Sequence, residues 1–172
     1  MIRLIIHLIT LILLFTIQVS FIHALPYPFD RIPFVLVVVV YLYQYANRTA
    51  SWWWLVCYGL LLDILSISLA PLETISYTLA TASMMFLVAH VFTNRSFYGM
   101  GATAVLSLSV LTISELSLLG LSRMFTSFPF LWKTLLSTNL WSAFFACFLL
   151  LFVFSSLRRA RSWLQIFFLD RV

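Results

Sequence analysis

Long apolar stretches, interrupted by short polar or proline-containing segments, run through the whole chain. There are six of them, at residues 4–25, 32–46, 52–70, 74–93, 98–121 and 134–157. A helix needs about 20 predominantly apolar residues to cross the hydrocarbon core of a bilayer. The pattern therefore predicts an all-α, polytopic membrane bundle of about six transmembrane helices, of which the second is the shortest.

The segments between these stretches contain residues that end helices. Three prolines separate the first two stretches, Pro26, Pro28 and Pro33. Proline lacks the backbone N–H that continues a helix. Polar or proline-containing turns separate the following stretches, at residues 47–51, 71–74 and 94–96. Because no connection is long enough for a soluble domain, we expect a single bundle at 1–157 and a tail at 158–172.

Composition indicates a membrane protein, and the distribution of charge indicates its orientation in the membrane. Hydrophobic residues make up 63% and charged residues 9% of the 172 residues, which cannot give a soluble globule a polar surface. If the N-terminus is cytoplasmic, seven of the ten Lys and Arg residues lie on that side. The positive-inside rule then predicts that both termini are cytoplasmic. The net charge of +5 is thereby explained as a topology signal, without nucleic-acid binding.

Both ends of the chain have a second interpretation. Arg3 followed by an apolar core resembles a signal peptide, but the core is longer than an ordinary one, so we expect a retained first helix. The tail begins with Arg158, Arg159 and Arg161 and continues with the aromatic segment 162–169. Such a segment can lie in the inner leaflet of the bilayer or bind a partner.

The third stretch contains a carboxylate in its middle, Asp63, within the sequence Gly-Leu-Leu-Leu-Asp-Ile-Leu-Ser. A central aspartate costs a membrane helix roughly 2.5 to 3.5 kcal/mol, so it should face protein and marks a candidate functional site. Gly59, Asp63 and Ser66 fall on one helical face, which a neighbouring helix can approach closely at the glycine. Glu73, just after Pro71, is interpreted as an acid that favours the dipole at the start of the fourth helix.

A second carboxylate, Glu115, lies in the fifth stretch among hydroxyl side chains, those of Ser107, Thr112, Ser114 and Ser117. No Lys or Arg lies inside an apolar stretch to neutralise either acid. Each acid can be protonated, can pair with a basic residue of another subunit, or can hydrogen-bond to hydroxyls and hold helices in register. The second alternative implies a partner protein.

Sequence motifs of enzymes and metal sites are missing. Cys57 and Cys147 lie in separate apolar stretches without metal-ligand spacing. His7, His23 and His90 are scattered over different stretches, and none forms a nucleophile or zinc motif. The sequence therefore predicts a protein that is not an enzyme and has no catalytic, metal or cofactor site.

The order of these features resembles that of MreD, the small rod-shape-determining membrane protein of bacteria. The matching features are a proline-rich turn at 25–33, a second span ending in tyrosines, the segment 59–66 followed by Pro71 and Leu72, Arg95 after the fourth span, Trp141 in the last span, and Arg158, Arg159 and Arg161 beyond it. The resemblance covers most of the chain and is sharpest from Gly59 to Tyr77. Residues 68–73 depart from it, because the family has a small or glycine-rich turn there.

The resemblance implies a non-enzymatic scaffold in the bacterial cytoplasmic membrane, within the complex that directs lateral cell-wall synthesis. Its implied partners are a bitopic MreC-like protein, the actin-like MreB and cell-wall synthases. The candidate partner-binding residues are Gly59, Asp63, Ser66 and Glu115, with the three arginines of the tail.

Two transporter classes remain as alternatives. The substrate-binding component of an energy-coupling-factor vitamin transporter is also a compact bundle of six spans, and it would hold a small ligand in its polar interior. Very short loops that cannot close over a ligand argue against it. A small ion-coupled transporter would need further relay residues and broken helix pairs, which the sequence lacks.

Overall fold

The computed structural model describes residues 2–45, 49–66, 71–92, 96–123 and 132–169. The elements in these ranges are α1 (Ile2–Thr16), the π-helical η1 (Ile17–Ile22), the 3-10 helix η2 (Phe29–Arg31), α2 (Phe34–Val40), the π-helical η3 (Tyr41–Tyr45), the 3-10 helix η4 (Thr49–Ser51), α3 (Trp52–Ser66), α4 (Leu72–His90), α5 (Phe97–Arg123) and α6 (Trp132–Leu169). Every regular element of the described ranges is a helix, which confirms the predicted all-helical fold.

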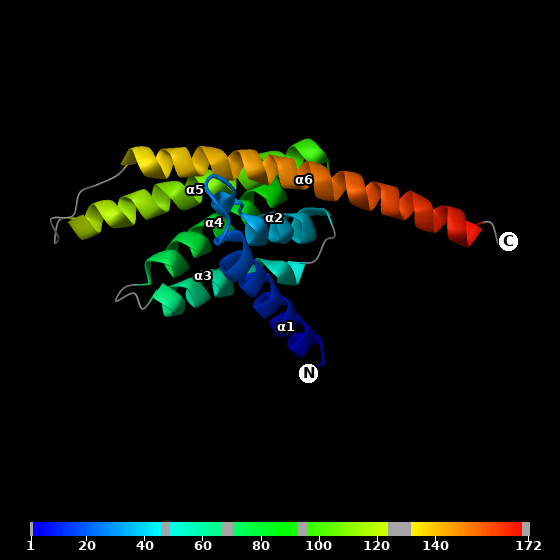
Figure 1. The fold of residues 1–172 in the computed structure, drawn as a ribbon, viewed down its shortest axis with the longest axis horizontal. Coiled ribbons are helices and arrows are strands. Elements are labelled where there is room, and N and C mark those ends of the chain that lie inside the picture. Colours follow the sequence, from blue (N-terminus) through cyan, green and yellow to red (C-terminus); the bar gives the residue numbers. More distant parts are fainter. Residues whose placement is uncertain (1, 46–48, 67–70, 93–95, 124–131, 170–172) are drawn as a thin grey trace.

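The helices pack in an order that follows the chain. The most extensive contacts join α3 to α4, α4 to α5 and α5 to α6. Figure 1 shows α1 crossing the bundle obliquely and α6 running along it, with the C-terminal part of α6 extending beyond the other helices. Because successive long helices alternate in direction, α1, α3 and α5 end where α2, α4 and α6 begin. The two chain termini belong to the opposite end of the bundle.

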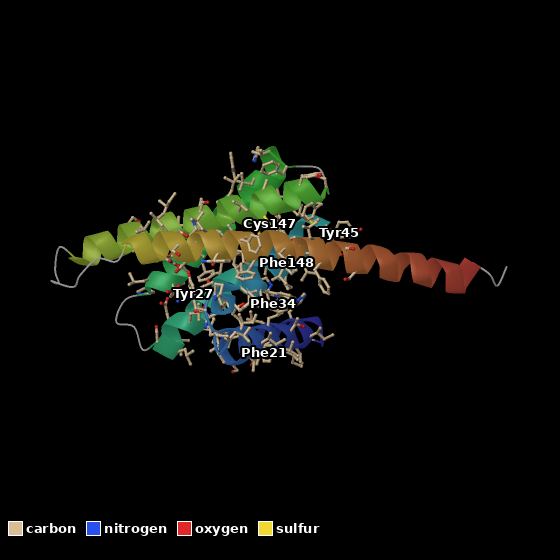
Figure 2. The ribbon with its side chains drawn as sticks, turned by 45° about the horizontal axis from the view of Figure 1, so that its top comes forward. Phe21, Tyr27, Phe34, Tyr45, Cys147 and Phe148 are labelled. Atoms are coloured by element: carbon tan, nitrogen blue, oxygen red, sulfur yellow. The ribbon has the colours of Figure 1, made fainter. Side chains whose placement is uncertain are left out.

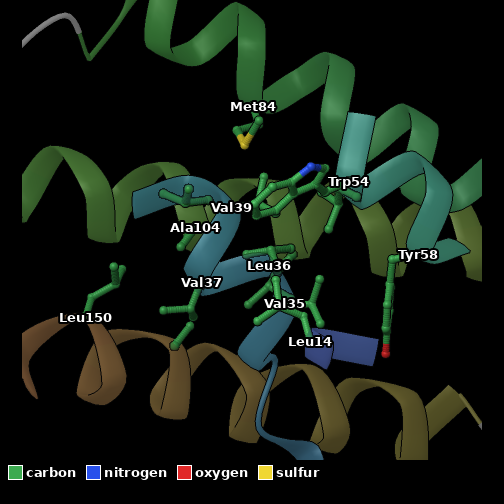
Figure 3. Packing of buried hydrophobic residues seen from close by; sticks show 14 of the residues in the cluster. Leu14, Val35, Leu36, Val37, Val39, Trp54, Tyr58, Met84, Ala104 and Leu150 are labelled. Carbon is green, nitrogen blue, oxygen red and sulfur yellow. The ribbon is translucent and has the colours of Figure 1, made fainter. Parts of the chain in front are cut away.

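The core forms around α2. This helix has the sequence Phe-Val-Leu-Val-Val-Val-Val, and five of its seven residues are buried. A helix that is apolar all round is stable where protein or lipid surrounds it, and here protein does. Its side chains meet Leu14 of α1, Trp54 of α3 and Leu150 of α6 in one cluster (Figure 3). The predicted second span is thus a short, central core helix. It consists of 7 α-helical and 5 π-helical residues, in keeping with an apolar stretch that is the shortest of the six.

Three helices in the described ranges are long and apolar enough to cross a membrane, judged by length and composition. They are Ile5–Ile22, Leu72–His90 and Phe97–Leu118, and two shorter apolar helices accompany them, Trp52–Ser66 and Leu136–Phe152. Large apolar side chains cover the outside of α1, η1 and α6, where Phe21 of η1 and Phe148 of α6 are more than half exposed (Figure 2). An apolar exterior of this kind is suited to contact with lipid.

The last helix differs from the prediction in its length. The structure contains one helix of 38 residues, α6, which passes the predicted boundary at 157/158 without a break. The side chains of Arg158, Arg159 and Arg161 lie outside the described part of the structure. The same is true of residues 68–70 and of the polar turns around Arg48 and Arg95.

Candidate functional site

Gly59 is the point where α3 approaches α4 most closely. A Cβ atom built on Gly59 would lie 2.9 Å from the Cβ of Tyr77, 3.0 Å from the carbonyl oxygen of Glu73 and 3.1 Å from the Cα of Thr74. Two of these three atoms belong to the backbone of α4, which cannot move aside as a flexible side chain can. The glycine is therefore required by the packing, as predicted for a face that a neighbouring helix approaches.

Asp63 caps the N-terminus of α4 from the neighbouring helix. Its Oδ1 accepts a hydrogen bond from the backbone N–H of Glu73 at 3.1 Å, and its Oδ2 accepts one from the backbone N–H of Thr74 at 2.7 Å. The hydroxyl of Thr74 also donates to Oδ2, at 2.5 Å. The first N–H groups of a helix have no partner inside the helix, and Pro71, which precedes α4, offers no capping side chain. The carboxylate satisfies two of these groups, and the positive end of the helix dipole favours its charge.

Ser66, the third residue of the predicted face, lies at the end of α3 and is exposed. Its hydroxyl donates to the backbone carbonyl of Asp63 at 3.2 Å, so it contacts its own helix and not α4. The three residues of the predicted face thus have three different surroundings: Gly59 is buried, Asp63 caps α4, and Ser66 lies at the rim of a cavity.

The cavity lies at the end of the bundle opposite the chain termini. Its volume is about 550 Å³, which falls within the range of pockets that hold small organic ligands. Its walls come from the segment between α1 and α2, the end of α3, the start of α4, the second half of α5 and the first half of α6. The lining residues are Gln18, His23, Asp30, Arg31, Ile32, Pro33, Tyr58, Leu62, Leu65, Ser66, Glu73, Tyr77, Leu108, Leu111, Thr112, Glu115, Thr138, Asn139 and Ser142.

Three carboxylates line this cavity, and one of them has a cationic partner. Asp30 forms an ion pair with Arg31, whose Nε lies 2.9 Å from Oδ2. The side chains of Glu73 and Glu115 make no hydrogen bond or ion pair with another described residue, and each lies within electrostatic range of the other. Glu73 of α4 therefore lies between the two predicted intramembrane acids, within electrostatic range of Glu115 and of Asp63.

His23 adds no positive charge to the cavity near neutral pH. Burial lowers the pKa of His23 below its usual value, and the nearby charge of Arg31 lowers this pKa further. Its Nε2 lies 3.3 Å from Nε2 of Gln18, an arrangement in which the amide donates to a neutral imidazole. Arg31 is already paired with Asp30, and His23 is neutral. Neither residue therefore neutralises Glu73 or Glu115.

Gln18 is a structural residue that the sequence reasoning did not single out. It is buried, and its Nε2 donates to the backbone carbonyl of Ile32 at 2.8 Å. Its Oε1 accepts from the backbone N–H groups of Phe34 at 3.0 Å and Val35 at 3.4 Å. One amide thus joins η1 to the start of the core helix α2. The sequence feature that could have indicated this role is that Gln18 is a lone amide side chain inside the first apolar stretch.

Replacing Gln18 with leucine is expected to lower the free energy of unfolding by about 2 kcal/mol. The apolar side chain would leave the buried N–H of Val35 without this partner, and a buried unsatisfied polar group costs about 1–3 kcal/mol. The carbonyl of Ile32 would lose one of its two bonds and keep the one from the N–H of Phe34. Reversible unfolding of the purified protein in mixed micelles measures the effect. The control is Thr16→Ala, which removes only a bond to the carbonyl of Ile12 within α1. Equal stability of the two variants would contradict the proposed role of Gln18.

Comparison of the chain with protein-family models, curated proteins and solved structures finds no match. What the fold and the cavity define is therefore a class: an all-helical protein with three helices suited to crossing a membrane and a charged cavity at one end of the bundle.

Proposed function

We propose that this chain is a non-enzymatic, multi-pass membrane scaffold of the MreD kind. In this proposal it resides in the bacterial cytoplasmic membrane with both termini cytoplasmic, and it binds a bitopic MreC-like protein in the complex for lateral cell-wall synthesis. MreB and cell-wall synthases are further partners. The observation that carries the proposal is the α3–α4 hairpin, because Gly59 and Asp63, where the resemblance to MreD is sharpest, together determine how these helices pack.

The length of α6 supports a scaffold. At 1.5 Å per residue its 38 residues extend about 57 Å, whereas the hydrocarbon core of a bilayer is about 30 Å thick. Figure 1 shows that its C-terminal part extends past the other helices. In the proposed orientation this part enters the cytoplasm with the sequence of Arg158, Arg159 and Arg161, which is suited to an acidic membrane surface or an acidic partner. The tail would thus place a basic helix where cytoplasmic partners assemble.

Affinity purification of the tagged chain from gently solubilised native membranes, followed by mass spectrometry, tests the proposal. We expect recovery of an MreC-like protein, with or without wall synthases, well above the amount that accompanies an unrelated tagged multi-pass protein. Recovery of neither an MreC-like protein nor a synthase would refute the scaffold.

The cavity favours one second candidate, the substrate-binding component of an energy-coupling-factor transporter. Its volume of about 550 Å³ and its several polar side chains suit a small ligand. The same purification separates the two candidates, because a transporter component would bring with it a pair of transporter ATPases in place of an MreC-like protein.

A further inference from the structure

The charges of the cavity are not used by the proposed scaffold. We propose that the cavity binds a small organic amine, whose ammonium group lies between Glu73 and Glu115. This inference goes beyond the scaffold proposal, and for the transporter candidate it names the class of ligand. It concerns only the end of the bundle that is opposite the chain termini.

The first argument is the balance of charge. Arg31 is the cationic residue of the lining, and Asp30 is its partner at 2.9 Å. This leaves Glu73 and Glu115 facing one cavity without a cation from the described residues. Two carboxylates that face one cavity repel each other, and burial adds to the cost of their charges. A bound cation would offset both effects.

The second argument is the kind of hydrogen-bonding group left unpaired. Two further side-chain oxygens of lining residues are buried and have no partner within the described structure, Oδ1 of Asp30 and Oδ1 of Asn139. These two oxygens and the carboxylates of the two glutamates are hydrogen-bond acceptors. An ammonium group has three donors and no acceptor, so it complements them. The two glutamates would repel an anion placed between them.

The third argument is size and wall chemistry. A volume of about 550 Å³ is far larger than a metal ion needs and suits an organic molecule. Leu62, Leu108 and Leu111 provide apolar surface for its carbon skeleton. Tyr58 and Tyr77 also line the cavity and contact each other edge to face, with ring centroids 5.1 Å apart. Aromatic rings beside carboxylates are a common setting for the recognition of ammonium groups.

Equilibrium dialysis of the full chain in lipid nanodiscs tests this proposal, with radiolabelled phenethylamine as the probe. The neutral analogue 2-phenylethanol has nearly the same shape and serves as the ligand control. We expect saturable binding of the amine and no comparable binding of the alcohol. Glu115→Gln should weaken amine binding by about tenfold or more, because it removes a charge-assisted hydrogen bond. Glu73→Gln should act in the same direction, so the test does not depend on one variant that folds.

Asp170→Asn makes the same kind of change near the C-terminus of the sequence and should leave amine binding unchanged. Equal binding of amine and alcohol, no binding of the amine by the wild-type protein, or wild-type affinity in both glutamine variants would overturn the proposal. If the amine does not bind and Glu115→Gln instead loses a co-purifying protein, the cavity receives a basic side chain of a partner helix, and the amine proposal is wrong. Recovery of an MreC-like protein is measured separately, so failure of one proposal is distinguishable from failure of the other.

Discussion

Gly59→Ala is expected to destabilise the protein by about 1–3 kcal/mol, although alanine normally stabilises a helix relative to glycine. The added methyl group would lie 2.9 Å from the Cβ of Tyr77 and 3.0 Å from the carbonyl oxygen of Glu73. Both distances are shorter than a van der Waals contact, so α3 and α4 would have to separate. Gly59→Val should cost more, because its branched side chain needs still more space. Unfolding of the purified variants in mixed micelles measures both effects.

Gly101→Ala is the matched control, since it makes the same change in another helix. A Cβ atom on Gly101 would meet no atom within 4 Å, so this variant should be neutral or more stable by up to about 1 kcal/mol. The opposite signs of the two substitutions are the diagnostic result. If Gly59→Ala were as stable as Gly101→Ala, the close packing of α3 on α4 would be refuted.

Helices could be predicted from the sequence where a proline bounds an apolar stretch, whereas the end of α6, which no such residue marks at 157, could not. Pro33 and Pro71 directly precede α2 and α4 in the structure. The close approach at Gly59 could also be predicted, since the face is defined by residues three and four apart. Local sequence determines such features because they depend on helical periodicity and on backbone chemistry alone.

The partners of the polar side chains could not be predicted in the same way. The backbone groups that Asp63 binds belong to residues 10 and 11 positions further along, and they reach it only because the helix hairpin folds back. Glu73 was interpreted from its own helix alone, as an acid favouring the dipole. Its position beside Glu115 depends on the packing of α4 against α5, which periodicity does not specify.

The central position of α2 has a similar cause. Its run of valines indicates an apolar helix, but an apolar helix can face lipid or protein equally well by sequence. In the structure Val39 and Val40 are fully buried, because α1, α3, α5 and α6 all contact α2. The N–H groups of Phe34 and Val35 at its start donate to Gln18, which holds this core helix against η1. Core position is thus a property of the assembled bundle.

The capping role of Asp63 changes how an intramembrane acid is understood here. An aspartate that two backbone N–H groups and a hydroxyl hold needs no basic residue from a partner to account for its presence. Of the three alternatives considered for the intramembrane acids, this arrangement corresponds to the one in which the acid hydrogen-bonds and holds helices in register. The hydrogen-bond donors are two backbone N–H groups as well as a hydroxyl. A partner that contacts this region would meet the hairpin that Asp63 stabilises.

Asp63→Ala is expected to lower the free energy of unfolding by about 2–4 kcal/mol, since it leaves the N–H groups of Glu73 and Thr74 at the start of α4 unpaired. Asp63→Asn should cost about 1–3 kcal/mol, because one oxygen becomes an NH₂ group that faces a donor. Unfolding in mixed micelles measures the stability. Hydrogen exchange of the Glu73 and Thr74 amides should also become faster in both variants.

Two controls separate this capping role from other effects of residue 63. Ser66→Ala removes a hydroxyl that bonds only to the carbonyl of Asp63, so it should change stability by less than about 0.5 kcal/mol. Thr74→Val removes the hydroxyl donor to Asp63 but keeps the charge and both backbone bonds, so its cost should lie between those of Ser66→Ala and Asp63→Asn. If Asp63→Asn unfolds like the wild type yet no longer recovers an MreC-like protein, capping is not the role of this carboxylate, and its charge acts on the partner directly.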